Sequence, residues 1–288
     1  RLRYDGLTED GVPITGWWSI QVNQFGDGYI AASRDVTSIV QAELAAQEAQ
    51  RQREAERITI ELLQGAALPG RLPDVAGIRL AAEYVPSAVD QPVGGDWYDV
   101  FSLDSDRVGL VIADVAGHGR SAAAFMLQVR NVFRAIAVEH AEPGEVMFRA
   151  NEVTHRLNEP DGPFVTCCFA VLHVPTRRLH WAQAGHFPPF VQRSDEPTVA
   201  LASRPGVPLA MFPRQRYTTS VEQLEVGDRV VMFTDGLVER RDEPLDVGLE
   251  RLRGRIDDLR PVGLGALVET IASEVTGRFD DLAVVALE

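Results

Sequence analysis

The chain has 288 residues, of which 45% are hydrophobic, and its formal net charge at pH 7 is -14. This length and hydrophobic share suit one large domain or two small ones, each with a buried core. The negative charge and the lack of a basic stripe argue against a nucleic-acid-binding protein, because affinity for phosphate backbones depends on clustered Lys and Arg.

Cysteine content and hydropathy bear on the cellular compartment. Cys167 and Cys168 are adjacent, so they form neither a disulfide framework nor a zinc site, and we expect them to be reduced core residues that face opposite sides of a strand. No apolar run approaches the ~20 residues that span a bilayer, and no signal peptide is visible. We therefore expect a cytoplasmic protein with no membrane partner. Because the first residue is Arg1 and not methionine, we also expect a piece of a longer protein.

The first 37 residues are predicted to form strands. Two stretches rich in strand formers, 16–22 and 29–37, flank a turn at Gly26-Asp27-Gly28. A hairpin this small is not stable alone in water. The Gly-Trp-Trp-Ser strand, the turn and the closing Arg-Asp-Val-Thr resemble the last strands of a PAS sensor domain, which implies that residues 1–37 are the C-terminal part of one. The alternative is an N-terminal hairpin of the domain that follows.

A long helix is predicted next, over residues 38–64. This stretch has neither Gly nor Pro and consists mainly of strong helix formers, which gives a helix of ~40 Å. Its ends are apolar, but residues 47–57 are almost wholly polar with a thin alanine seam. Such a helix gains little by packing on a core, so we expect it to pair with its twin in a homodimer. A single solvated linker helix is the alternative.

A boundary follows this helix. Gly65, Pro69-Gly70 and Pro73 are predicted to end it, which leaves a linker over 38–67 and a second domain over 68–288.

In the second domain, runs of strands alternate with pairs of helices. The predicted strands cover 78–85, 97–103, 108–112, 164–174, 178–184, 217–221, 229–233 and 282–287. The predicted helices cover 121–139, a segment with an apolar stripe at Val146, Ala150, Val153 and Leu157, and the segments near 249–259 and 264–275. This order predicts an α+β fold in which helices lie on the faces of antiparallel sheets.

Two aspartates mark the open end of one predicted hairpin. The motifs Gly94-Gly95-Asp96-Trp97-Tyr98-Asp99 and Ala113-Asp114-Val115-Ala116-Gly117-His118-Gly119 flank two apolar runs that are joined at Asp104-Ser105-Asp106. Asp96 and Asp114 are equally distant from Ser105, so the closed hairpin brings their carboxylates side by side. Two such groups repel each other unless a proton or a cation lies between them.

Two further aspartates lie at strand ends. Asp235 closes the strand 229–233, and Asp280 opens the strand 282–287. Because the end of one antiparallel strand lies beside the start of the next, all four aspartates can gather at one edge of the sheets. Four carboxylates at one edge suit a hard divalent cation such as Mg²⁺ or Mn²⁺. The alternative is that each aspartate only caps a turn.

Four motifs in this order resemble the metal-dependent protein phosphatases (PPM), in the bacterial branch typified by SpoIIE and RsbU. They are Gly-Gly-Asp-Trp-Tyr-Asp, Ala-Asp-Val-Ala-Gly-His-Gly, Phe-Thr-Asp-Gly-Leu-Val-Glu and Phe-Asp-Asp-Leu-Ala-Val-Val, and the similarity covers about residues 60–288. The resemblance implies an αββα sandwich. It also implies two Mn²⁺ or Mg²⁺ ions that activate water for attack on a phosphoserine or phosphothreonine.

The resemblance assigns roles to particular residues. Asp114 matches the carboxylate that bridges both ions, Val115 matches a ligand through its carbonyl, and Asp96, Asp235 and Asp280 match the other acidic ligands. Members of this branch commonly follow a sensor domain and a linker helix. Their usual substrate is a phosphorylated anti-anti-sigma factor of the STAS fold, which implies a role in sigma-factor control.

Other features of the motifs leave open questions. His118 is a candidate general acid, although it lies four residues past Asp114, where a loop histidine bonded to the backbone is the alternative. His186 is expected to organise its own turn, and no arginine clearly matches the one that grips phosphate in some relatives. Gly-Gly-Asp also begins the diguanylate cyclase signature, but Trp97 and Tyr98 replace its Glu-Phe. A catalytically silent docking module with the phosphatase fold is the alternative function.

Overall fold

The structure is a computed structural model, and it divides into two compact units, residues 1–58 and 59–288. It describes residues 2–7, 13–86, 95–117, 120–140, 142–159, 162–240, 243–274 and 281–288.

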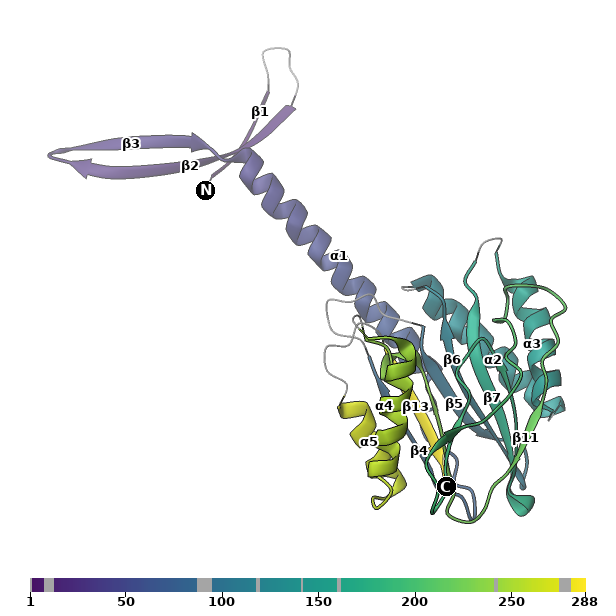
Figure 1. The fold of residues 1–288 in the computed structure, drawn as a ribbon. Coiled ribbons are helices and arrows are strands. Elements are labelled where there is room, and N and C mark those ends of the chain that lie inside the picture. Colours follow the sequence, from purple (N-terminus) through teal and green to yellow (C-terminus); the bar gives the residue numbers. More distant parts are fainter. Residues whose placement is uncertain are drawn as a thin grey trace. The chain divides into compact units, whose positions relative to one another are not determined.

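The first unit contains a three-stranded antiparallel sheet (Figure 1). Its strands are β1 (Leu2–Leu7), β2 (Pro13–Phe25) and β3 (Gly28–Asp35), in the order β1-β2-β3. Gly26 adopts a φ of 60° in the β2–β3 turn, a conformation that favours glycine. The predicted strands and turn are therefore confirmed.

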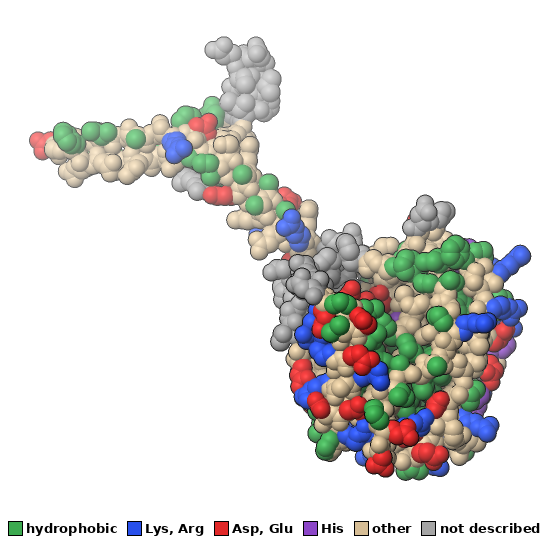
Figure 2. Space-filling view, viewed as in Figure 1, with side chains coloured by type: hydrophobic (Ala, Val, Ile, Leu, Met, Phe, Trp, Pro, Cys, Tyr) green, Lys and Arg blue, Asp and Glu red, His purple; other side chains and the backbone are tan. Residues whose placement is uncertain are grey.

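This small sheet exposes apolar side chains. Trp18, Ile20 and Val22 lie on the same face of β2, because every second residue of a strand points the same way, and their exposed fractions are 39%, 49% and 58%. Figure 2 shows apolar side chains along the β2–β3 hairpin. The described side chains of this sheet are exposed or half-buried, so the sheet gains little free energy from apolar burial. Its origin in a PAS domain stays a prediction.

Helix α1 (Thr37–Ala67) confirms the predicted long helix but ends later than predicted. It continues through Gly65, where a break was predicted, because a helical glycine costs only about 1 kcal/mol relative to alanine. Pro69 lies just beyond the end, and a proline both lacks an N–H group and disfavours helical backbone before it. Among the described residues, no helix has the length and apolar character needed to cross a bilayer.

The second unit is a sandwich of two five-stranded antiparallel sheets, in the orders β10-β9-β12-β13-β4 and β11-β8-β7-β6-β5. The strands of the first sheet are β4 (Leu80–Val85), β9 (Phe190–Gln192), β10 (Val199–Ala200), β12 (Arg229–Phe233) and β13 (Leu282–Leu287). Those of the second sheet are β5 (Trp97–Ser102), β6 (Arg107–Val115), β7 (Val165–His173), β8 (Arg178–Ala184) and β11 (Ser220–Gln223).

Two pairs of helices cover the outer faces of the sandwich (Figure 1). They are α2 (Arg120–Glu139) with α3 (Pro143–Leu157), and α4 (Leu245–Asp258) with α5 (Leu264–Ser273). Two short 3₁₀ helices, η1 (Val174–Thr176) and η2 (Asp235–Leu237), follow β7 and β12. The predicted αββα sandwich of the α+β class is therefore confirmed.

Three apolar cores hold these four layers together. Successive residues of a strand face opposite ways, so neighbouring residues of one strand belong to different cores. Trp97 packs under α2 and α3, whereas the next residue, Tyr98, faces the other sheet. Cys167 and Cys168 divide in the same way and are both free, as predicted. The third core joins β12 and β13 to α4 and α5.

Two short strands were not predicted, and the prediction of one buried helix face was wrong. Strands β9 and β10 have three and two residues and carry no alternating pattern, so the sequence did not reveal them. On α3, Val153 and Leu157 are 38% and 57% exposed instead of buried. The buried face turns toward Asn151 and Thr154, because the Asn151 side chain binds the Ala210 N–H at 2.9 Å and the Phe212 carbonyl at 2.9 Å. A purely apolar stripe does not reveal a face held by hydrogen bonds.

Candidate metal centre at one edge of the sandwich

The β5–β6 hairpin brings Asp96 and Asp114 together. The cross-strand register pairs Trp97 with Ala113, so Asp96 and Asp114 lie opposite each other one position further on. Asp96 is 1% exposed, and Asp114 is partly buried. Asp96 lies two residues before Tyr98, and Asp114 lies two residues after Ile112, and both of these residues face the other sheet. Because every second residue of a strand lies on the same face, the two carboxylates are directed to the space between the two sheets. The predicted juxtaposition is confirmed.

The backbone of Val115 packs closely against Gly95, beside Asp96 and Asp114. The Val115 N–H donates to the Gly95 carbonyl at 3.2 Å. A Cβ atom on Gly95 would lie 2.4 Å from the Val115 carbonyl oxygen, closer than any real Cβ contact. Only glycine therefore fits at position 95, and the Val115 carbonyl lies at the same edge as the two carboxylates.

Asp235 lies at the corresponding edge of the other sheet. It follows β12 and begins η2, and the neighbouring Thr234 exchanges backbone and hydroxyl hydrogen bonds with Ala283 at the start of β13. A Cβ atom on Gly236 would lie 1.9 Å from the Asp281 carbonyl oxygen. Asp235 is thus held against the first residues of β13, as the sequence predicts. Asp280 lies outside the described residues.

Asp281 is a buried acid that the sequence reasoning did not single out. It is 0% exposed, and its Oδ2 accepts a hydrogen bond of 2.6 Å from the Tyr84 hydroxyl on β4. This bond fixes the start of β13 against β4, directly after Asp280. The doubled Asp-Asp at 280–281 was the only signal of it in the sequence.

The two edges are connected through one buried side chain, His186. Its ring nitrogens lie 2.9 Å from the Thr166 hydroxyl on β7 and 3.1 Å from the Phe233 carbonyl at the end of β12. Thr166 pairs with Asp114 across the β6–β7 ladder, and Phe233 precedes Asp235 by two residues. The Asp96–Asp114 pair and Asp235 therefore belong to the same edge of the sandwich.

Asp99, in the same motif as Asp96, has a different environment. It faces α2, is fully buried, and receives two hydrogen bonds of 2.5 and 2.7 Å from the Arg134 guanidinium. Arg130, one helical turn earlier, lies 3.2 Å from it. These arginines neutralise Asp99, so it joins β5 to α2. The sequence motif alone could not distinguish it from a metal ligand.

The donor set at the edge fits hard divalent cations. It consists of oxygen atoms, and carboxylate and carbonyl oxygens are the donors that Mg²⁺ and Mn²⁺ prefer. Adjacent carboxylates also repel each other unless a proton or a cation lies between them. Within the described residues, no three acidic, His or Cys side chains form a complete metal centre. Asp280 and the candidate acid His118 both lie outside the described residues, so their roles stay predictions.

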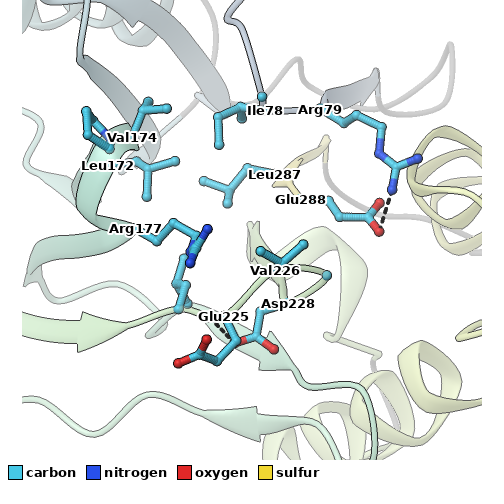
Figure 3. Close-up of a pocket in the computed structure, with 14 residues that line it drawn as sticks. Ile78, Arg79, Leu172, Val174, Arg177, Glu225, Val226, Asp228, Leu287 and Glu288 are labelled. Atoms are coloured by element: carbon cyan, nitrogen blue, oxygen red, sulfur yellow. Dashed lines mark hydrogen bonds and ion pairs between the residues drawn. The ribbon is translucent and has the colours of Figure 1, made fainter.

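A cavity of about 470 Å³ lies at the opposite end of the sandwich (Figure 3). Its floor is apolar and includes Leu172 and Leu287. Two of the acids that line it pair with arginines, Glu288 with Arg79 at 2.7 Å and Asp228 with Arg193 at 3.0 Å. These two acids are therefore paired with arginines and not with each other.

Comparison with known sequences identifies the family of the chain. Residues 104–288 match the family described as Stage II sporulation protein E (SpoIIE). The chain belongs to the SpoIIE family. The matched span contains Asp114, Val115, Asp235 and Asp280, while Asp96 lies before it.

Relatives of this SpoIIE family member include phosphoserine phosphatase RsbU of Bacillus subtilis, which is 27% identical over 181 residues, or 63% of this chain and 52% of RsbU. Protein IcfG of Synechocystis is 25% identical over 260 residues, or 78% of this chain and 40% of IcfG. The chain thus spans about half or less of the length of these relatives.

Solved structures agree on the fold. The RsbU and RsbW domains of a Mycobacterium tuberculosis protein superpose with a TM-score of 0.67 at 26% identity, covering 77% of this chain and 62% of that one. The SiaA PP2C domain of Pseudomonas aeruginosa gives a TM-score of 0.67 at 17% identity, covering 83% of this chain and 97% of that one. The SpoIIE family member therefore has the PPM phosphatase fold.

Proposed function

We propose that the chain is a metal-dependent phosphoprotein phosphatase that hydrolyses phosphoserine or phosphothreonine. The observation that carries this proposal is the meeting of Asp96 and Asp114 across the β5–β6 ladder, at the edge where Asp235 abuts the start of β13. Membership of the SpoIIE family and the similarity to RsbU, whose name is phosphoserine phosphatase, support it.

Each ligand has a defined task in this proposal. Asp114, the Val115 carbonyl, Asp96, Asp235 and Asp280 would together hold two Mn²⁺ or Mg²⁺ ions, with Asp114 shared between them. When bound, the ions supply Lewis-acid activation of water and neutralise charge on the phosphoryl group. Asp96 is buried, and the Val115 backbone packs too closely on Gly95 to admit a Cβ atom, so these donors need little reorganisation when substrate arrives.

A direct test is hydrolysis of p-nitrophenyl phosphate with Mn²⁺ and with a chelator. We expect turnover with the ion and none with the chelator. A catalytically silent docking module would give the same background rate in both conditions. His118→Ala can be assayed in parallel, because loss of a general acid lowers turnover of a poor leaving group such as phosphoserine more than that of p-nitrophenol.

We further propose a phosphorylated anti-anti-sigma factor of the STAS fold as the substrate, in a sigma-factor or stress-response switch. The similarity to RsbU and to a chain that carries RsbU and RsbW domains supports this assignment. The test is release of phosphate from a phosphorylated STAS protein, compared with a phosphoserine peptide of the same local sequence. Equal rates on both substrates would contradict recognition of the folded STAS domain.

The domain plan is also a proposal: a PAS-like remnant over 1–37, a linker over 38–67 and a phosphatase domain over 68–288. Helix α1 is long, and its middle is exposed and polar except for a thin alanine seam, which is the surface along which a second copy would pair. We propose homodimerisation through this linker. Sedimentation equilibrium should give a dimer for the full chain and a monomer for a chain that begins at Leu68.

A further inference from the structure

His186 lies on the segment that passes from one sheet of the sandwich to the other. Strand β8 ends at Ala184 in the sheet that contains β6, and β9 begins at Phe190 in the sheet that contains β12. Between them, Gly185 adopts a φ of 67° and its N–H donates to the Gly206 carbonyl at 2.7 Å. This turn directs the chain across the gap between the sheets, and His186 is 8% exposed there.

The hydrogen-bond partners of His186 determine which ring nitrogen carries the proton. The Phe233 carbonyl can only accept, so Nε2 carries the hydrogen and donates to it at 3.1 Å. Nδ1 is then an acceptor, and it receives the Thr166 hydroxyl at 2.9 Å. Burial lowers the pKa of His186 to about 4, so the ring is neutral at physiological pH and keeps this pattern.

Each partner lies beside a proposed metal ligand. Thr166 is the direct cross-strand neighbour of Asp114, and such neighbours have Cβ atoms about 4.5–5.5 Å apart. Phe233 precedes Asp235 by two residues at the end of β12. His186 therefore forms a continuous hydrogen-bonded connection from the strand pair that carries Asp114 to the strand that carries Asp235.

We infer that His186 and Thr166 are positioning residues that set the distance between Asp114 and Asp235 across the two sheets. This inference rests on the proposed function, because it takes those aspartates as metal ligands. Ions in two-metal sites lie about 3.5–4 Å apart, so a small change in sheet spacing displaces a ligand from one ion. Apolar packing between the sheets is non-directional, whereas two hydrogen bonds fix both distance and orientation.

Aromatic packing around His186 supports this role. The ring centroid of Phe187 lies 5.8 Å from the ring centroid of His186 and 5.5 Å from that of Phe233. Phe187 thus packs against both the imidazole and the end of β12. A residue that only anchored its own turn would require a hydrogen bond to one sheet, whereas His186 has a hydrogen bond to each of the two sheets.

The test compares Thr166→Val, which removes one hydrogen bond with almost no change of shape, with Thr166→Ser, which retains the hydroxyl. Thr154→Val is the matched control, because Thr154 is also buried but donates its hydroxyl to the Ala150 carbonyl on α3. Mn²⁺ binding is measured by isothermal titration calorimetry, and thermal unfolding is measured separately in a chelator.

We expect Thr166→Val to weaken binding of one Mn²⁺ ion at least tenfold, which corresponds to a loss of ~1.4 kcal/mol or more in binding free energy. Thr166→Ser, which retains the hydroxyl, should bind Mn²⁺ within about threefold of wild type. Thr154→Val should lower the unfolding temperature without changing Mn²⁺ binding. His186→Phe, which removes both bonds and keeps a ring of similar shape, should weaken binding at least as much as Thr166→Val. If all variants bind Mn²⁺ like wild type, the inference is wrong.

Asp114→Asn and Asp235→Asn, titrated in the same way, separate this inference from the proposed function. If these two variants bind Mn²⁺ like wild type, the ligand assignment itself fails. If they lose an ion while Thr166→Val and His186→Phe do not, the ligand assignment stands and only the positioning role is overturned.

Discussion

The two ends of the sandwich use acidic residues in opposite ways. At the end with the cavity, Asp228 and Glu288 each pair with an arginine of the chain. At the other end, Asp96 and Asp114 lie next to each other, and Asp235 abuts β13 on the facing sheet. An acid beside an arginine stabilises the fold, whereas adjacent acids repel each other unless a proton or a cation lies between them.

The most severe test of this comparison is the same substitution at both ends. Asp114→Asn and Asp235→Asn should each lower p-nitrophenyl phosphate turnover by about three orders of magnitude or more, because a metal ligand is lost. Asp228→Asn, which keeps an oxygen to accept the Glu225 N–H, should retain turnover close to wild type. Circular dichroism should show folded protein in all three. Retained turnover in Asp114→Asn or Asp235→Asn at saturating Mn²⁺ would contradict the assignment.

Asp99 sharpens the comparison within one strand, since it lies three residues from Asp96. Asp99→Leu should lower the free energy of unfolding by about 3 kcal/mol, because it leaves Arg130 and Arg134 without their buried partner. Urea denaturation measures this change. In an Arg130→Met, Arg134→Met background the same substitution should cost less than half as much. An equal cost in both backgrounds would show that the ion pair is not the cause.

A pH titration tests the neutral state of His186. Its folded-state pKa of about 4 lies below the usual 6.5, so the unfolded chain binds a proton that the folded chain does not. Its contribution to stability is therefore complete above about pH 6.5 and is lost as pH falls toward about 4, by ~2 to 3 kcal/mol. His186→Phe should lack this loss in urea unfolding with chelator present. Parallel pH dependence in the two proteins would argue for a solvated histidine.

The smallest expected effect concerns the linker. Inserting one alanine after Gln50 turns the rest of α1 by about 100°. If the helix transmits register from a dimer, turnover should change severalfold without loss of fold. Inserting seven residues restores the heptad phase and should restore the original rate. If both insertions and a chain starting at Leu68 match the intact chain in rate, the helix only tethers.

Much of the fold could be predicted from local pattern. The β5–β6 hairpin followed from two apolar runs joined by a turn, with Asp96 and Asp114 at equal distances from Ser105, and the cross-strand register confirms it. The α3 face could not be predicted, because Asn151 is buried by hydrogen bonds to residues about 60 positions away. The short strand β9 forms only because β12 and β10 flank it.

The site also contains residues that the sequence could predict and contacts that it could not. Asp96, Asp114 and Asp235 could be predicted because strand ends bring them together, which depends on order and spacing alone. The contacts of Asp99 with α2 and of Asp281 with Tyr84 depend on which face packs against which layer. His186 was expected to organise its own turn, and its link between Thr166 and Phe233 became visible only from the arrangement of the two sheets.

The most direct test of the central claim is a count of bound ions. Calorimetric titration of the chelator-treated chain with Mn²⁺ should give two sites for wild type and for Asp228→Asn, and fewer than two for Asp114→Asn. Two sites in Asp114→Asn, or no binding to wild type, would contradict a metal centre at the Asp96–Asp114 edge.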